Sequence, residues 1–276
     1  MENVYGLIGF PVEHSLSPLM HNDAFASLGI RARYHLFSVK PEQVGEAIVG
    51  VRALGIAGVN VTIPHKMAVI PFLDEVDEHA RRIGAVNTIV NDNGRLVGYN
   101  TDGPGYVKAL EEEMDVHLDG KRILLVGAGG GARGIYFSLL STAAERIDIA
   151  NRTTEKAARL VSEGADGRSA FFPLAEAERR LAEYDIIVNT TSVGMHPHVN
   201  EQPLSLEQLR PGTIVSDIIY NPLETKWLKE AKERGARGQN GVGMLVYQGA
   251  LAFEKWTGHW PDVNRMKQLV MEALRR

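Results

Sequence analysis

Residues 58–66, "GVNVTIPHK", combine a strand pattern with side chains that can bind a ligand or transfer a proton. Apolar residues at positions 59, 61 and 63 alternate with Asn60 and Thr62, which predicts a strand with one apolar face. A strand buried in a sheet core would avoid the amide and the hydroxyl on its other face, because burying unpaired polar groups is costly. Lys66 follows the end of this strand. We therefore interpret Asn60, Thr62 and Lys66 as candidates for a ligand site.

Three other segments place polar side chains next to predicted strand or helix ends. Ser15 and Ser17 stand at the start of a predicted helix, where two hydroxyls and backbone N–H groups would bind a carboxylate. Asn87 lies within an apolar strand, and "GYNTDG" puts Asp102 at a strand end before a helix. Ser17 and Asp102 are also suitable N-caps, and this structural alternative stays open. Together the segments predict a small polyhydroxylated ligand with one anionic group, at the sheet edge where α/β proteins bind ligands.

A glycine-rich loop, "GAGGGARG" at residues 127–134, follows an apolar strand and opens a helix. This is the context that the dinucleotide-binding fingerprint requires. Gly127 permits a tight turn, Gly129 lets the backbone approach a pyrophosphate, and the small Ala132 lets helix and strand pack closely. A flexible loop or another nucleotide site, such as that of a methyltransferase, is the alternative. The flanking strand and helix favour a dinucleotide, which suggests that the polyhydroxylated ligand is oxidised at one hydroxyl.

The end of the next strand distinguishes NAD from NADP. An NAD site usually has an acidic residue about 20 positions further on, which binds the ribose 2′-hydroxyl. This chain has Arg152 there, followed by Thr153 and, one helical turn on, Lys156. A guanidinium and hydroxyls suit a 2′-phosphate dianion. The sequence therefore predicts NADP, although Glu155 is an opposing charge and Arg152 could instead be a solvated surface residue.

Strand and helix patterns alternate along most of the chain, which predicts two α/β domains. In the first hundred residues they imply a mostly parallel sheet, and "NDNG" at residues 91–94 predicts a hairpin that adds one antiparallel strand. A second unit, a Rossmann-type dinucleotide-binding fold, begins near residue 121. The last forty residues read as helices without strands, and we expect them to return to the first domain. The predicted domains are residues 1–102 with 238–276, for substrate binding and catalysis, and residues 103–237, for NADP binding.

Composition and charge exclude several function classes. The 276 residues are 44% hydrophobic and 23% charged, close to the average of globular proteins. The net charge of −4 favours no nucleic-acid partner, and no apolar run approaches the length of a membrane helix. There is no cysteine, which excludes thiolate metal sites, and the nine histidines show no metal-binding spacing. Because the N-terminus also lacks a signal-peptide pattern, we expect a cytoplasmic protein without a metal.

Eight segments resemble, in order and near their spacing, the motifs of shikimate dehydrogenases. They are "GFPVEHSLSPLMHN", "NVTIPHK", "GAVNTIV", "GYNTDGPGY", "LLVGAGGGARG", "NRTTEKA", "YNPLETKWL" and "GMLVYQGALAFEKWTG". Each is modest evidence alone, but eight in register are specific and cover almost the whole chain. Gly131 stands where the family more often has alanine, which would loosen the loop slightly. The resemblance implies NADP-linked interconversion of 3-dehydroshikimate and shikimate, within aromatic amino-acid biosynthesis.

The resemblance also implies a role for each matching residue. Lys66 and Asp102 would form the catalytic pair, and Ser15 and Ser17 would hold the substrate carboxylate. The other positions for substrate binding or orientation would be Asn60, Thr62, Asn87, Tyr220 and Gln248. The cofactor-binding positions would be Gly127, Ala128, Gly129, Gly130, Gly131, Asn151, Arg152, Thr153, Lys156, Ile218 and Gly241. The implied partners are a small-molecule substrate and NADP, in a monomer or homodimer, with no nucleic acid and no membrane.

The implied catalytic pair contains a conflict that bears on mechanism. A lysine is a poor base at its ordinary pKa of about 10.4. Burial lowers the pKa of a lysine, whereas a neighbouring carboxylate raises it. We therefore expect Lys66 and Asp102 to share the proton chemistry as a coupled pair, rather than Lys66 to act alone as a base.

Two other functions stay open at this point. One is a quinate/shikimate dehydrogenase that accepts NAD, which an acidic residue in place of Thr153 or Thr154 would favour. The other is a non-catalytic, NADP-sensing regulator on the same fold, which the loss of Lys66 or Asp102 would favour. Both of these residues are present.

Overall fold

The structure, a computed structural model, describes residues 2–275 and divides into two compact units. Unit 1 extends to Gly105 and resumes at Val246, and unit 2 is Tyr106–Leu245. The chain passes from one unit to the other within two helices, α4 (Asp102–Met114) and α9 (Val242–Thr257). The predicted fold class is confirmed, because both units are α/β and the C-terminal helices belong to unit 1. The functional domain limits near residues 102 and 238 stay a prediction.

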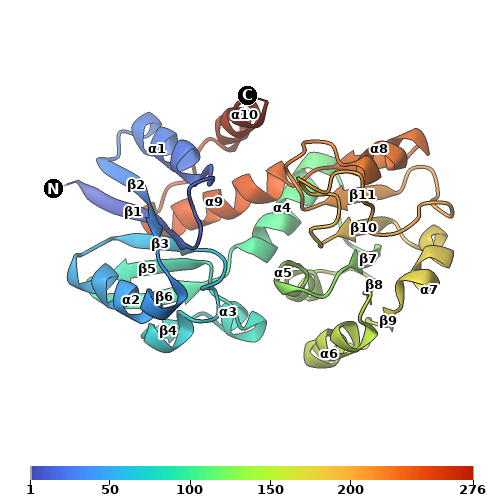
Figure 1. Cartoon of the computed structure of the whole chain (residues 1–276), viewed down its shortest axis with the longest axis horizontal. Coiled ribbons are helices and arrows are strands. Elements are labelled where there is room, and N and C mark those ends of the chain that lie inside the picture. Colours follow the sequence, from blue (N-terminus) through green and yellow to red (C-terminus); the bar gives the residue numbers. More distant parts are fainter. Residues whose placement is uncertain (1, 276) are drawn as a thin grey trace. The chain divides into compact units, whose positions relative to one another are not determined.

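Unit 1 is built on a six-stranded sheet with the order β2-β1-β3-β5-β6-β4 (Figure 1). The strands are β1 (Asn3–Gly9), β2 (Ala32–Ser38), β3 (Gly58–Val61), β4 (Glu75–Val76), β5 (Thr88–Asp92) and β6 (Arg95–Tyr99). β5 runs antiparallel to both of its neighbours, whereas the other pairings are parallel. The predicted hairpin is confirmed as the turn between β5 and β6. Because β5 is reversed, its first residues lie at the same sheet edge as the last residues of β3 and β6.

Helices cover both faces of the unit 1 sheet. They are α1 (Ser17–Ser27), α2 (Val44–Ala53), α3 (Glu78–Ile83), α9 and α10 (Val263–Leu274), with 3₁₀ turns at Pro41–Gln43 and Ile70–Phe72. α1 and α9 share an apolar core with Tyr5 and Tyr34, whereas α2 and α3 share another with Val59 and Val61. Since side chains alternate along a strand, Asn60 faces the α1 and α9 side. α10 lies beside α1, where Arg265 forms an ion pair with Asp23 (Figure 1).

Unit 2 has the strand order of a dinucleotide-binding Rossmann fold. Its strands are β7 (Arg122–Val126), β8 (Arg146–Ala150), β9 (Phe171–Phe172), β10 (Ile186–Asn189), β11 (Ile214–Asp217) and β12 (Arg237–Gln239). They form one parallel sheet in the order β12-β11-β10-β7-β8-β9. The order reverses between β7 and β10, and in such sheets the ligand binds at the carboxyl ends of the strands at that point.

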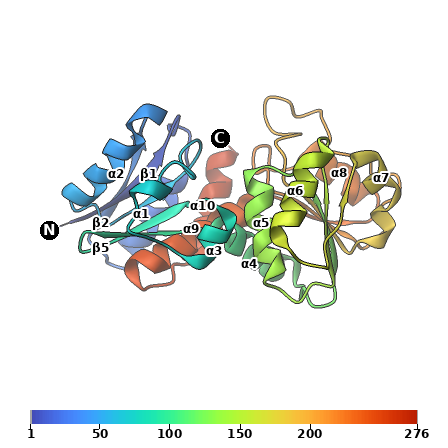
Figure 2. The ribbon, with the colours of Figure 1, turned by 90° about the horizontal axis from the view of Figure 1, so that it is seen from below.

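The unit 2 helices also cover both faces of their sheet. They are α5 (Gly130–Leu140), α6 (Thr154–Gly164), α7 (Leu174–Arg179) and α8 (Lys226–Glu233), with a 3₁₀ turn at Leu181–Glu183. α7 and α8 pack around the fully buried Trp227, and α5 and α6 cover the opposite face (Figures 1 and 2). No helix within residues 2–275 is long and apolar enough to cross a membrane.

A buried carboxylate organises the loops after β10 and β11. Asp217 is 1% exposed, and its carboxylate accepts hydrogen bonds from the Ile219 backbone at 3.0 Å, Thr225 at 2.9 Å and Asn189 at 3.1 Å. Asn189 in turn accepts from the backbone and the hydroxyl of Thr191. The carboxylate therefore ties both loops to the start of α8. Burial raises the pKa of Asp217 to about 6, despite these hydrogen bonds.

We predict that Asp217→Asn changes the pH dependence of stability. The folded state holds a proton on Asp217 up to about pH 6, whereas an unfolded aspartate loses it near its usual pKa of 3.8. The wild-type contribution is therefore complete below pH 3.8 and decreases as the pH rises to 6, by as much as roughly 3 kcal/mol. Asparagine mimics the protonated acid, so the variant should gain stability relative to wild type over this interval.

Urea unfolding between pH 4 and pH 8 measures the difference in unfolding free energy. Glu207→Gln removes an exposed carboxylate of the same unit and controls for the loss of one charge. A difference between the Asp217→Asn variant and wild type that is the same at pH 4 and pH 8 would contradict the prediction.

Candidate active site

Polar side chains meet at one edge of the unit 1 sheet, where β3 and β6 end and β5 begins. Asn60 is opposite Thr88 in the β3–β5 pairing, and Thr88 is opposite Tyr99 in the β5–β6 pairing. Asn87, which precedes β5, and Asp102, which follows β6, are therefore neighbours although they come from different strands. The sequence prediction that these polar segments share a sheet edge is confirmed for the residues of unit 1.

Lys66 and Asp102 form an ion pair at this edge. Lys66 Nζ lies 2.6 Å from Asp102 Oδ2, and the two side chains are 30% and 19% exposed. The second carboxylate oxygen accepts a hydrogen bond from Asn87 Nδ2 at 2.9 Å. The backbone N–H of Asp102 donates to Asn100 Oδ1 at 3.1 Å. The Asp102 carboxylate is thus bound by Lys66 and Asn87, rather than serving as a cap for α4.

The backbone around Lys66 is fixed on both sides. His65, which is 1% exposed, has its Nε2 2.6 Å from the backbone oxygen of Val39. The backbone N–H of His65 donates to Thr62, and the Lys66 carbonyl accepts from Val86 at 2.8 Å. The turn after β3 therefore aims the lysine at Asp102. His65 makes a local hydrogen bond, as an ordinary structural histidine does.

Buried amides connect the polar sheet edge to the interior of unit 1. Asn60 and Asn87 are 5% and 2% exposed. Asn60 Nδ2 donates to the Asn87 carbonyl and to Thr88, both at 3.2 Å, and its Oδ1 accepts from the Tyr34 hydroxyl at 2.7 Å. Both N–H groups of Asn60 are therefore used within the protein, so its geometry suits orientation of neighbours rather than donation to a ligand.

Asn87 lies at the centre of the polar cluster. Its Oδ1 accepts from the Thr101 backbone at 2.7 Å and from Thr88 at 3.0 Å. Its Nδ2 donates to Asp102 and lies 3.5 Å from Gln248 Oε1, so the predicted contribution of α9 reaches this cluster. The bonds to Oδ1 fix the amide so that its N–H groups face the carboxylate.

The serine pair at the start of α1 differs from the expected cap. The helix begins at Ser17, Leu16 occupies the N-cap position, and no side chain caps the helix, so the cap interpretation of Ser17 is wrong. Ser15 Oγ lies 3.1 Å from Ser17 Oγ and accepts from the Ser17 backbone at 3.2 Å. These two hydroxyls stand at the N-terminus of an eleven-residue helix, and their role in binding a carboxylate stays a prediction. Thr62 is half-buried after β3.

The glycine loop of unit 2 fits a dinucleotide. Gly127 has φ of 120°, and a Cβ there would lie 2.5 Å from the Thr190 hydroxyl, so a side chain would be strained and would clash. Cβ atoms at Gly129 and Gly130 would meet nothing within 4 Å. α5 begins at Gly130 without a side-chain cap, which leaves its first N–H groups for an anion. The half-buried Ala128 completes the loop.

Three further predicted cofactor positions are neighbours in unit 2. A Cβ on Gly241 would clash with the backbone of Ile218, and a Cβ on Gly131 would lie 3.2 Å from the end of the Ile218 side chain. Gly241 also donates a backbone hydrogen bond to Ile219 at 2.9 Å. The family's more usual alanine at position 131 would therefore need only a small shift of Ile218, whereas position 241 requires glycine.

The positive segment after β8 is open to solvent. Arg152, Thr153 and Lys156 are exposed, and the hydroxyl of Thr153 makes no cap hydrogen bond to α6. Asn151 Nδ2 donates to the Thr153 carbonyl at 2.8 Å and so braces the turn. These side chains are available for a 2′-phosphate. Tyr220, 36% exposed after β11, belongs to unit 2, so its predicted place in the substrate pocket stays a prediction.

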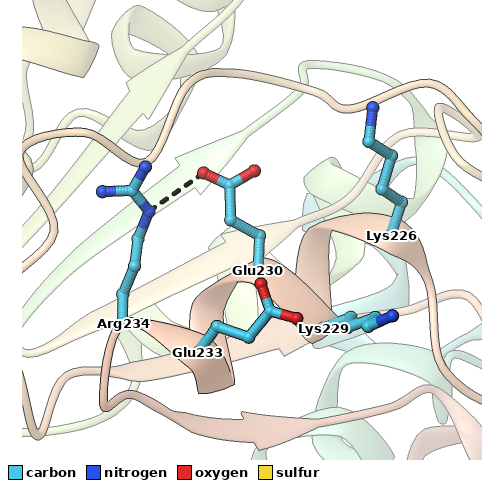
Figure 3. A pocket seen from close by; sticks show the side chains of 5 residues that line it. All are labelled: Lys226, Lys229, Glu230, Glu233 and Arg234. Carbon is cyan, nitrogen blue, oxygen red and sulfur yellow. Dashed lines mark hydrogen bonds and ion pairs between the residues drawn. The ribbon is translucent and has the colours of Figure 1, made fainter.

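A charged hollow in unit 2 is separate from the predicted site residues. A hollow beside α8 is lined by Lys226, Lys229, Glu230, Glu233 and Arg234 (Figure 3). The lining has three cations and two carboxylates, with Arg234 paired to Glu230 at 2.9 Å, and none of the predicted site residues lines it. Within residues 2–275, no three His, Cys, Asp or Glu side chains are grouped to hold a metal.

Sequence reasoning missed the residues behind the polar cluster. Tyr34 and Thr88 are buried and bonded to Asn60, but both lie in ordinary strand patterns. A tyrosine in a strand is as common in a plain core as in a polar network, so composition could not reveal them. Only the pairing of β3 with β5, across 28 residues of sequence, brings Thr88 to Asn60.

Comparisons with known proteins assign the whole chain to one family. Residues 7–89 match the shikimate dehydrogenase substrate binding domain, residues 108–218 match the shikimate / quinate 5-dehydrogenase family, and residues 241–271 match the shikimate 5′-dehydrogenase C-terminal domain. A shikimate dehydrogenase (NADP(+)) of Geobacillus kaustophilus (strain HTA426) is 86% identical over 276 residues, which is all of both chains.

Solved structures agree with the sequence comparison. The shikimate 5-dehydrogenase of Listeria monocytogenes, in complex with shikimate and NAD, has a TM-score of 0.93 at 38% identity, covering 98% of this chain and 96% of that one. The shikimate 5-dehydrogenase of Thermus thermophilus, in complex with NADP(H) and shikimate, has a TM-score of 0.90 at 38% identity, covering 98% and 99%. The chain therefore belongs to the shikimate dehydrogenase family.

Proposed function

We propose that this chain catalyses the reversible NADP-dependent reduction of 3-dehydroshikimate to shikimate, with Lys66 and Asp102 handling the proton. The observation that carries the proposal is the 2.6 Å ion pair at the polar sheet edge. Reduction of the ketone adds a hydride to carbon and a proton to oxygen. NADP, when bound, supplies the hydride chemistry. The chain's own residues must then bind the substrate and provide the proton.

Lys66 is well placed to donate to the ketone oxygen. An ammonium group has three N–H donors, and within the described residues one of them is given to Asp102. The others can polarise the carbonyl and pass on a proton during reduction. In the reverse direction, the pair accepts the hydroxyl proton, with Asp102 compensating the ammonium charge.

The substrate carboxylate is the group that Ser15 and Ser17 recognise. Their hydroxyls lie 3.1 Å apart at the start of α1, where the backbone N–H groups and the helix dipole also favour an anion. Thr62 and Gln248 contribute hydrogen bonds to the ring hydroxyls. Retention of both catalytic groups argues against a non-catalytic NADP sensor, and the absence of an acid beside Arg152 argues against an NAD-linked quinate enzyme.

A cytoplasmic location and a monomeric or homodimeric state complete the proposal. The substrate and NADP are small polar molecules, and the relatives named above come from bacteria. Size-exclusion chromatography with light scattering distinguishes a 30.3 kDa monomer from a dimer.

Removal of the ammonium group should abolish most turnover. We predict that Lys66→Ala lowers kcat by roughly 100-fold or more, because general acid–base groups contribute about this factor, and leaves the KM for shikimate within about threefold. Steady-state assays of NADPH formation measure both parameters, with the exposed Lys40→Ala as control. A variant with near-normal kcat and a raised KM would make Lys66 a binding residue and refute the assignment.

Neutralising the carboxylate should affect both parameters. We predict that Asp102→Asn lowers kcat by roughly tenfold or more and raises the KM for shikimate, because the variant loses the charge that fixes Lys66. Asn87 Nδ2 would then face an amide that can present its own N–H groups, which disturbs the cluster further. Unchanged kcat and KM would remove Asp102 from the proposed pair.

Arg152 should determine the preference for NADPH. We predict that Arg152→Ala raises the KM for NADPH by roughly tenfold or more, because it removes a charge-assisted contact, and that NADH kinetics change little. Arg159→Ala, on the exposed surface of α6, is the matched control. Assays with shikimate and with quinate also test the alternative substrate. An equal rise in KM for both cofactors would mean that Arg152 does not recognise the 2′-phosphate.

A further inference from the structure

Tyr34 in β2 connects α1, the helix that begins at Ser17, with the buried amides. Its hydroxyl donates to Asn60 Oδ1 at 2.7 Å. Tyr34 is 2% exposed, so the phenol contacts protein rather than solvent. We propose that Tyr34 is a positioning residue that couples the carboxylate-binding end of the site to the catalytic pair through Asn60. This inference rests on the roles proposed above for Ser17, Asp102 and Lys66.

Tyr34 is fixed to α1 by two neighbouring residues. Asn22 bonds to both backbone groups of Tyr34, accepting from its N–H at 2.9 Å and donating to its carbonyl at 3.1 Å. The ring of His21 stacks on the Tyr34 ring, with centroids 4.5 Å apart and planes 14° apart. Because positions 17 and 21 are four apart, Ser17 lies on the same side of the helix as His21. The position of the phenol is therefore set by the helix that begins at Ser17.

The stacking ring of His21 is uncharged. His21 is 0% exposed, and burial lowers the pKa of its ring to about 3. Within the described residues, neither of its ring nitrogens has a hydrogen-bond partner. His21 therefore supports Tyr34 as a flat packing surface rather than as a polar group of the network. This explains why the histidine beside the serine motif has no direct place in the chemistry.

The hydrogen bonds beyond Tyr34 run in one direction to Asp102. Asn60 accepts a hydrogen bond from Tyr34 on Oδ1 and donates one from Nδ2 to Thr88. Thr88 donates to Asn87 Oδ1, and Asn87 donates from Nδ2 to Asp102. The two ends of an amide are different, one accepting and one donating, so each bond selects the orientation of the next. The Tyr34 hydroxyl is the donor at the beginning of this series.

The phenol remains a donor under working conditions. Burial raises the pKa of Tyr34 well above its usual value, so its hydroxyl stays protonated. Without it, Asn60 Oδ1 would lose its partner in a site where Asn60 is only 5% exposed. An unpaired buried acceptor is costly, and the amide would shift to reach water or another donor. That shift would pass through Thr88 and Asn87 to the carboxylate.

Tyr34→Phe tests the inference because it keeps the packing ring and removes only the hydroxyl. We expect kcat to fall by roughly tenfold, the effect of losing one buried hydrogen bond, with the KM for shikimate within about threefold. Tyr184→Phe is the matched control in unit 2, because it removes a phenol that donates to the buried Asp148 at 2.8 Å. It should lower the thermal midpoint but leave kcat unchanged.

A double-mutant cycle identifies the route of the effect. In an Asn60→Ala background, the further change Tyr34→Phe should alter kcat by less than about twofold, because the link to Asp102 is already absent. A tenfold loss in both backgrounds would show that Tyr34 does not act through Asn60 and would overturn the inference. A Tyr34→Phe enzyme with wild-type kcat would also overturn it, whereas the Lys66→Ala result reports separately on the proposed catalytic pair.

Discussion

The position of the Lys66–Asp102 ion pair is the constraint on which the proposed catalytic edge depends. A partly exposed pair of this kind gives little stability by itself, because water screens it and two flexible side chains must be ordered. Its geometry therefore has to come from neighbouring groups. Asn87 binds the free oxygen of the carboxylate, and the bonds of His65 and Val86 fix the backbone of the lysine. The reversed strand β5 is what brings Asn87 to the same edge as the other two segments.

In the proposed mechanism, folding and catalysis use the same hydrogen bonds in unit 1. The amides of Asn60 and Asn87 are buried, so each unmet donor or acceptor would cost about 1–3 kcal/mol. That cost selects one arrangement in which Tyr34, Thr88 and Thr101 satisfy them. The arrangement that is most stable for the fold is thus the one that presents an N–H group to Asp102. A substitution behind the pair can therefore change turnover without touching the substrate.

The sequence was informative wherever a function depends on a local pattern. The glycine loop, Arg152 and the polar strand ends are short motifs, and the structure places them at the carboxyl edges of the two sheets. Contacts between distant strands were not predictable in the same way. Tyr34 donates a hydrogen bond to Asn60, 26 residues further along the chain. The alternation of residues in a strand does not show whether a tyrosine hydroxyl is hydrogen-bonded or the ring only packs in the core. The prediction that Ser17 caps the helix was wrong, because the helix starts one residue earlier than the sequence pattern suggests.

The two units differ in the charge of their buried polar side chains. In unit 2, the buried Asp148 and Asp217 tie strands and loops together. In the described part of unit 1, the buried polar side chains are hydroxyls, amides and histidines, with no carboxylate among them. A further buried charge about 4 Å from the catalytic pair would interact with it by about 4 kcal/mol at an effective dielectric constant of about 20. Neutral amides orient the Asp102 carboxylate through hydrogen bonds without adding a further buried charge beside the pair.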